Sequence, residues 1–173
     1  MKSRAEAMNE FSTYSHELLY QFMKAVISAT IVGVAEGENP FGAGIFSLDG
    51  AAISVMCNRS VSQNNPLAHA ETLAITDACQ KIGTHNLQAY LLVTTAEPCP
   101  MCLSAAATAN ITNIVFGASQ SVVDRTGYRS LGITARQLNK LLTPPTALHG
   151  PFLESDCVAL LLNHPQTNST HHH

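Results

Sequence analysis

Four residues in two short stretches of the chain have the types and spacing of a metal centre with an acid beside it. His69 and Glu71 lie in the first stretch, and Cys99 and Cys102 lie about thirty residues further on. One imidazole and two thiolates suit a tetrahedral zinc whose fourth position is left to water. Glu71 is then a free acid next to that water. The sequence therefore predicts one catalytic Zn²⁺ per chain, with Glu71 as the proton-transfer group.

The spacing of these residues also predicts the local structure that holds them. Cys99 and Cys102 are three apart, so on the first turn of a helix both side chains lie on one face. The prolines on either side of Cys99 favour a helix start, because a first-turn residue needs no amide hydrogen. Residues two apart in mid-helix point about 200° away from each other. We therefore expect His69 and Glu71 to share a site only at the beginning of a second helix.

Each half of this pattern has a less specific interpretation. A C-x-x-C pair can be a redox dithiol, but that motif follows the first strand of a thioredoxin-like βαβ unit. Here the pair follows an apolar run near the middle of the chain. A closed structural zinc site needs a fourth protein ligand, and no second C-x-x-C or H-x₃-H pattern supplies one. The catalytic interpretation is favoured.

Length and composition indicate one domain with a large core. The chain has 173 residues, of which 46% are hydrophobic and 12% are charged. We expect a single domain over 1–164 and a tail over 165–173, whose last three histidines resemble an expression tag. A surface so poor in charge favours a homodimer. The net charge of −3 provides no basic field and disfavours nucleic acid as a partner.

The cysteines and the apolar segments favour a cytoplasmic protein. Five cysteines are an odd number, and we expect Cys57, Cys79 and Cys157 to be buried free thiols, as in a reducing compartment. The polar beginning of the chain lacks a secretory pattern. The apolar run 25–35 is too short to span a bilayer.

Hydrophobic periodicity places the motifs in an α/β order. Asp49-Gly50 is a strong hairpin signal between two short apolar runs. A polar loop over 57–67 leads into the helix that carries His69 and is well placed to touch a substrate. The expected helices are 9–36, 68–81, 100–110, 134–142 and 155–162; the expected strands are 43–48, 51–56, 89–95 and 113–117; and 118–132 is expected to be loop. Alternating strands and helices imply parallel pairing and a sheet covered by helices.

The chain resembles the cytidine deaminase superfamily. H-x-E followed by P-C-x-x-C is the signature of zinc deaminases, and both halves occur here in order. Within 39–118, the motifs Pro40-Phe41-Gly42-Ala43, Asn65-Pro66-Leu67-Ala68-His69-Ala70-Glu71 and Glu97-Pro98-Cys99-Pro100-Met101-Cys102, together with Asn58, are most similar to the branch of guanine deaminases and tRNA adenosine deaminases. The resemblance implies a three-layer α/β/α sandwich with a five-stranded mixed sheet, and a dimer.

The resemblance also implies roles for particular residues. His69, Cys99 and Cys102 would bind zinc, and Glu71 would move the proton. Asn58 would hydrogen-bond the base, and the backbone at Ala70 and Cys99 would help to hold the base and the developing charge.

The chain departs from the guanine deaminases in one place. Where they carry a Gly-Phe-Asp-acid run whose last carboxylate assists proton transfer, this chain has Gly127-Tyr128-Arg129-Ser130. Asp124 is the nearest acid that could substitute.

We expect hydrolytic deamination of an amino-substituted heterocycle, with release of ammonia. A free purine-type base or nucleoside, guanine-like, is favoured as the substrate. The alternatives are an adenosine in tRNA, a cytosine- or triazine-type substrate, or a structural-zinc binding module without activity.

Overall fold

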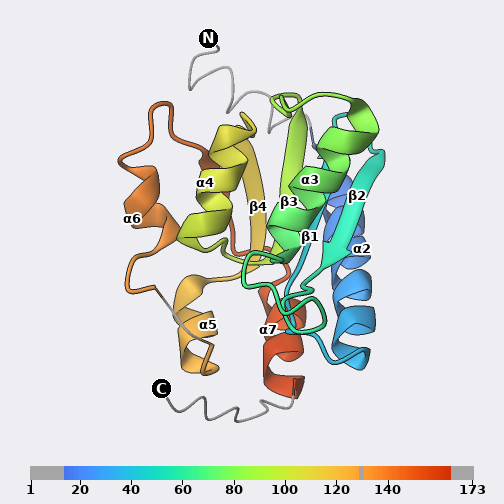
Figure 1. The fold of residues 1–173 in the computed structure, drawn as a ribbon, viewed down its shortest axis with the longest axis vertical. Coiled ribbons are helices and arrows are strands. Elements are labelled where there is room, and N and C mark those ends of the chain that lie inside the picture. Colours follow the sequence, from blue (N-terminus) through green and yellow to red (C-terminus); the bar gives the residue numbers. More distant parts are fainter. Residues whose placement is uncertain (1–13, 129–130, 165–173) are drawn as a thin grey trace.

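A single mixed sheet forms the centre of the computed structural model, which describes residues 14–128 and 131–164 (Figure 1). The strand order is β2-β1-β3-β4-β5, with β1 antiparallel to both neighbours and the β3-β4 and β4-β5 pairs parallel. The elements are α2 (His16–Ala35), β1 (Gly42–Ser47), β2 (Ala52–Cys57), α3 (Ala70–Ile82), β3 (Tyr90–Ala96), α4 (Pro100–Thr108), β4 (Asn113–Ala118), α5 (Gln120–Arg125), α6 (Ala135–Asn139), β5 (Ala147–His149) and α7 (Glu154–Asn163).

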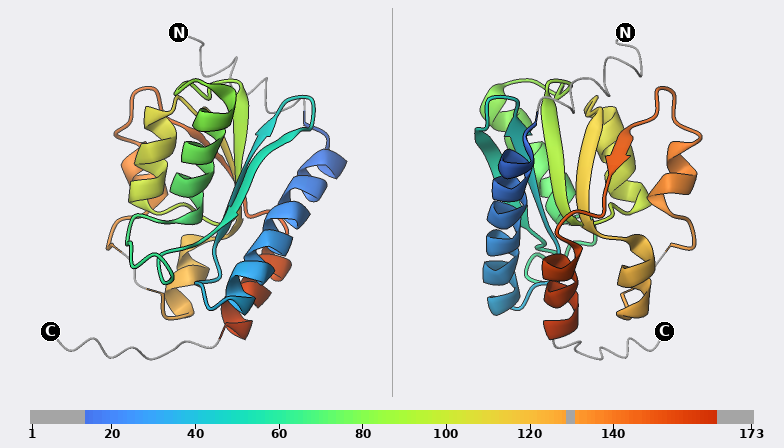
Figure 2. Two further views of the ribbon diagram at one scale, coloured as in Figure 1. Left: turned by 45° about the vertical axis from the view of Figure 1, so that its right-hand side comes forward. Right: turned by 180° about the vertical axis from the view of Figure 1, so that it is seen from behind.

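Helices cover both faces of this sheet, which confirms the predicted three-layer arrangement. α3 and α4 lie on one face and α2 and α7 on the other (Figure 2). The layers follow from the alternation of side chains along the strands. Leu92 of β3 packs in the cluster with α3 and α4, whereas its neighbours Leu91 and Val93 pack in the cluster with α2 and α7. β3 is thus buried on both faces, as its continuous apolar run predicts.

The hairpin and the end of α3 follow the turn chemistry of the sequence. β1 and β2 pair with Gly42 opposite Cys57, and the connecting turn contains Gly50 at a φ of 97°. A left-handed residue at that position favours glycine because it has no Cβ. α3 ends at Gly83, whose φ of 76° is that of a left-handed helix cap.

The second half of the chain differs from the predicted elements. The expected loop 118–132 contains the short helix α5, and the helix expected over 134–142 is reduced to α6. The fifth strand, β5, has only three residues and pairs with β4. Hydrophobic periodicity cannot reveal elements this short, because their stability comes from tertiary contacts.

One expectation about burial needs correction. Cys57 and Cys157 are buried, but Cys79 is only half-buried.

The apolar run 25–35 belongs to α2, a helix of 20 residues that is long and apolar enough, by length and composition alone, to cross a membrane. In the described structure one face of α2 packs on the sheet through residues that include Phe22 and Val26. The helix therefore contributes to the core, and the predicted beginning at residue 9 lies outside the described residues.

Candidate metal centre

The predicted metal ligands meet at one edge of the sheet, where two helices begin. His69 is the N-cap residue of α3, Cys99 is the N-cap residue of α4, and Cys102 lies in the first turn of α4. β3 runs toward this edge and its end leads directly into α4 (Figure 1). A proline occupies the first helical position of α4, as the sequence predicts. The two helix starts bring together residues that are thirty positions apart in the chain.

The distances between the three ligand atoms fit one zinc ion. The two sulfur atoms of Cys99 and Cys102 are 3.5 Å apart, and His69 Nδ1 lies 3.8 Å from Cys99 Sγ and 3.5 Å from Cys102 Sγ. Usual zinc–sulfur and zinc–nitrogen bonds at tetrahedral angles would separate two sulfurs by about 3.8 Å and a sulfur from a nitrogen by about 3.6 Å. The donor set and its spacing therefore suit tetrahedral zinc, with one position left over.

The electrostatics of the ligands favour a cation between them. The hydrogen bond between the two thiols is the largest influence on the pKa of Cys99, and it lowers that pKa despite burial. The same hydrogen bond, followed by burial, raises the pKa of Cys102. Zinc bound there would take up both sulfurs as thiolates, because metal ligation requires the deprotonated form. The hydrogen bond with Cys99 also raises the pKa of His69.

Glu71 lies beside these ligands and is nearly enclosed. It occupies the first turn of α3, and only 8% of its surface is exposed. Burial is the main cause that raises the pKa of its carboxyl group, and the negative charge of Cys99 raises it further. A carboxyl group with a raised pKa can both accept and release a proton near neutral pH, which is the property that an acid–base catalyst needs.

Asn58 reaches the same edge of the sheet from β2. Its backbone N–H donates to the carbonyl of Phe41 (2.8 Å), and the next residue, Arg59, donates to the carbonyl of Ala68 (3.0 Å), directly before His69. Asn58 is buried, with 2% of the residue exposed. Ala70 is fully buried in the first turn of α3, where helix geometry leaves the backbone N–H without an intrahelical acceptor.

Asp124, the acid considered as a substitute, does not join this cluster. It is exposed on α5 and accepts a hydrogen bond from the side chain of Gln120 (2.7 Å). Arg129 and Ser130 lie outside the described residues.

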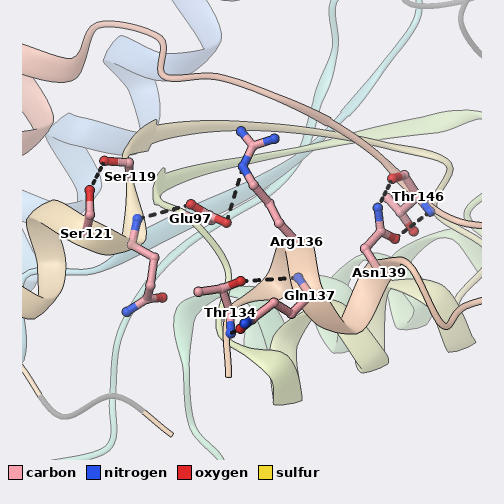
Figure 3. Close-up of polar contacts among 9 residues, drawn as sticks. Glu97, Ser119, Ser121, Thr134, Arg136, Gln137, Asn139 and Thr146 are labelled. Atoms are coloured by element: carbon pink, nitrogen blue, oxygen red, sulfur yellow. Dashed lines mark hydrogen bonds and ion pairs between the residues drawn. The ribbon is translucent and has the colours of Figure 1, made fainter. Parts of the chain in front are cut away.

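Glu97 is a buried acid in the connection between β3 and α4, two residues before Cys99. The sequence pattern assigned it no role of its own. One carboxylate oxygen accepts the backbone N–H of Gln120 (3.1 Å), and the other lies 3.7 Å from Nε of Arg136 (Figure 3). The Arg136 guanidinium also lies over the ring of Phe116, 5.3 Å from its centroid. Glu97 therefore links the β3–α4 connection, which carries Cys99, to α5 and α6. An acid directly after a buried strand was the signal in the sequence.

Comparisons with known proteins agree with this geometry. The family model for the cytidine and deoxycytidylate deaminase zinc-binding region matches residues 16–118. Guanine deaminase of Bacillus subtilis is 37% identical over 108 residues, which cover 62% of this chain and 69% of that protein. The tRNA-specific adenosine deaminase of the same organism is 36% identical over 97 residues, covering 56% of this chain and 60% of that protein.

Solved structures show the same fold. A guanine deaminase from Nitrosomonas europaea superposes with a TM-score of 0.72 at 28% identity, covering 81% of this chain and 80% of that one. The protein NE0047 in complex with 2,6-diaminopurine gives a TM-score of 0.78 at 28% identity, with 88% of this chain and 84% of that chain covered. The predicted fold and zinc cofactor are confirmed, and the chain belongs to the cytidine and deoxycytidylate deaminase family of zinc-dependent hydrolytic enzymes.

Proposed function

We propose that this enzyme hydrolyses the amino group of a free purine-type base or nucleoside, guanine-like, and releases ammonia. The observation that carries the proposal is the juxtaposition of three ligand atoms, which lie within 4.8 Å of one another, with the enclosed acid Glu71. His69, Cys99 and Cys102 would hold the zinc ion through one nitrogen and two sulfurs. Zinc bound there supplies a Lewis acid that activates water at neutral pH.

Glu71 performs the proton transfers in this proposal. It accepts a proton from the attacking water and passes it to a ring nitrogen of the substrate, while oxygen adds to the carbon that bears the amino group. It then takes the proton of the new hydroxyl group and gives it to the amine; the carbonyl forms, the C–N bond breaks, and the amine leaves as ammonia. Its burial excludes bulk water from these transfers and keeps its proton affinity high.

Asn58 and the first turns of the two helices would hold the base. The Asn58 amide is buried at the end of β2 and would provide a directional hydrogen bond to the base. The backbone at Ala70 and at Cys99 belongs to helix starts, whose N–H groups favour a partial negative charge. These groups would stabilise the charge that develops on the substrate.

Two features support a small substrate over a nucleic acid. The relatives include a guanine deaminase, and the chain has nine Lys and Arg residues against twelve Asp and Glu. Affinity for RNA depends largely on contacts between cations and phosphates, which this balance disfavours. The test is ammonia release from a panel of guanine, adenine, adenosine, guanosine, cytosine and aminotriazines. A protein inactive on every purine but active on cytosine or a triazine would contradict the proposal.

An adenosine in tRNA is the second candidate substrate, because a tRNA-specific adenosine deaminase matches the chain almost as well. A gel shift with tRNA at moderate salt separates the two candidates. We expect no shift at micromolar protein, and tight binding would reverse the order of the candidates.

A third role for the centre, a structural zinc in a binding module, is addressed by chelation. In the proposed function, removal of zinc abolishes ammonia release while the fold persists, because two hydrophobic clusters hold the sheet and helices together. A chain that unfolds when zinc is removed would favour the structural role.

We further propose that residues 1–164 form one domain, that the protein is cytoplasmic, and that it is a homodimer. An apolar groove of about 450 Å³ lies along α3 and α4, and Leu67 at its rim is 62% exposed. A second copy that covered this groove would bury apolar surface next to the metal centre. Light scattering at micromolar concentration should give twice the mass of one chain, and a monomeric mass would contradict the dimer.

A further inference from the structure

The side chains of Asn39, Ser60 and Asn58 form a directed chain of hydrogen bonds. The Asn39 side-chain nitrogen donates to Oγ of Ser60 (3.2 Å), and Oγ of Ser60 donates to the side-chain oxygen of Asn58 (2.6 Å). The backbone N–H of Ser60 donates to the same oxygen (2.9 Å). A serine hydroxyl has a single hydrogen. Because Oγ already receives a hydrogen from Asn39, its own hydrogen is directed to Asn58.

This chain fixes the orientation of the Asn58 amide. Its oxygen receives two hydrogen bonds from Ser60, which fills both acceptor positions of that atom. If the amide turned over, its NH₂ group would face the Ser60 backbone N–H, donor against donor. A backbone N–H cannot change into an acceptor, whereas a hydroxyl can rotate. Asn58 can therefore offer only its NH₂ group to a ligand.

The loop that carries Ser60 is itself held by a buried carboxylate. Glu38 is fully enclosed, and its two oxygens accept the backbone N–H groups of Val61 (3.1 Å) and Ser62 (2.9 Å). These two residues follow Ser60 directly. The position of Ser60 is thus fixed on one side by Asn39 and on the other by Glu38.

We propose that Ser60 is a positioning residue that makes Asn58 a hydrogen-bond donor only, so that the site selects heterocycles with an acceptor opposite Asn58. The acceptor is a ring nitrogen or a carbonyl oxygen. Analogues with a C–H group there are rejected because the Asn58 NH₂ group is left without an acceptor. Analogues with an N–H group there are rejected because two hydrogen-bond donors face each other. The inference rests on the proposed role of Asn58 in holding the substrate.

Kinetics of the full zinc-loaded protein test the selection. The variants are Ser60→Ala, Ser60→Thr and Ser62→Ala, and the probes are guanine, 3-deazaguanine and 7-deazaguanine, each analogue lacking one ring-nitrogen acceptor. The parent should lose at least tenfold in kcat/KM on one analogue. Ser60→Ala should raise KM for guanine about tenfold with kcat within threefold, and reduce that discrimination. Ser60→Thr, which keeps the hydroxyl, should behave as the parent.

Ser62→Ala is the matched control, because it removes a side-chain bond to Glu38 in the same loop without touching Asn58. Its KM and discrimination should stay within twofold of the parent. Equal effects of Ser62→Ala and Ser60→Ala would mean that Ser60 only stiffens the loop, and would overturn the proposal. Unchanged discrimination in Ser60→Ala would overturn it as well.

A measurement without substrate separates this inference from the proposed function. In NMR spectra of the zinc-loaded protein, the Asn58 NH₂ signals are assigned by their loss in Asn58→Asp. The inferred orientation predicts no strong NOE between these protons and the Ser60 backbone N–H. A strong NOE would refute the orientation even in an active enzyme. If instead the orientation holds and no purine is turned over, the proposed substrate class fails and the donor assignment stands.

Discussion

Replacement of Glu38 by Gln tests how strongly a buried carboxylate holds the loop that carries Ser60. Burial raises the pKa of Glu38, but hydrogen bonds from Ser62 and Val61, together with nearby Arg59, outweigh it and lower the pKa below its ordinary value of 4.5. Gln keeps one acceptor oxygen and places an NH₂ group against the other backbone N–H. The lost charge-assisted bond and the opposed donor together cost about 1–3 kcal/mol at this site, which lies just beneath an exposed loop.

Urea denaturation of the parent and of Glu38→Gln, both with saturating zinc, measures this difference in the free energy of unfolding. A carboxyl group whose pKa is lowered by folding contributes stability above its ordinary pKa and loses it as pH falls through the folded-state pKa. The difference between the two proteins should therefore be constant from pH 7 to about pH 5 and narrow below that.

Glu36→Gln is the matched control for this experiment. Glu36 pairs with Arg59 at the surface, where 50% of the Glu36 side chain is exposed, and such a pair contributes about 0–1 kcal/mol. If Glu38→Gln were as stable as the parent, or if both variants were destabilised equally, the role given to the buried carboxylate would be wrong.

Three further predictions concern the proton-transfer acid, the buried acid Glu97 and the packing of β1. Glu71→Gln should retain zinc but lose about 10²–10⁴-fold in kcat, and activity within tenfold of the parent would refute the proton-transfer role. Glu97→Gln keeps the hydrogen bond to α5 but loses the charge facing Arg136. The affinity for zinc, measured by competition with a chelator, should fall about tenfold. An unchanged affinity would contradict the positioning role of Glu97. Gly42→Ala would place a Cβ 1.9 Å from Oγ1 of Thr30 and should destabilise by about 1–3 kcal/mol in urea. Thr30→Ala in the same chain should recover part of that loss, and additive destabilisation would argue against the clash.

The sequence predicted the metal centre well because its chemistry is local. The helix start at Pro100 and the three-residue spacing of Cys99 and Cys102 determine the ligand geometry within one turn. Likewise, the Asp49-Gly50 turn determined the hairpin. In each case a few neighbouring residues carry the whole physical reason for the structure.

The contacts of Glu97 and of Asn58 could not be predicted in the same way. The partners of Glu97 lie on α5 and α6, two short helices with weak periodicity, and the pairing with Arg136 joins positions about forty residues apart. The chain from Asn39 through Ser60 to Asn58 also spans different segments, and its members are residue types common in turns. Their roles depend on tertiary distances, which spacing along the chain does not encode.

X-ray absorption at the zinc edge tests the central claim most directly, because it reports the atoms bound to the metal in solution. The account predicts two sulfur ligands at about 2.3 Å and two nitrogen or oxygen ligands at about 2.0–2.1 Å. Loss of one sulfur in Cys99→Ser, with the nitrogen shell retained, would support the assignment. A shell of three or four sulfurs, or one without sulfur, would contradict it.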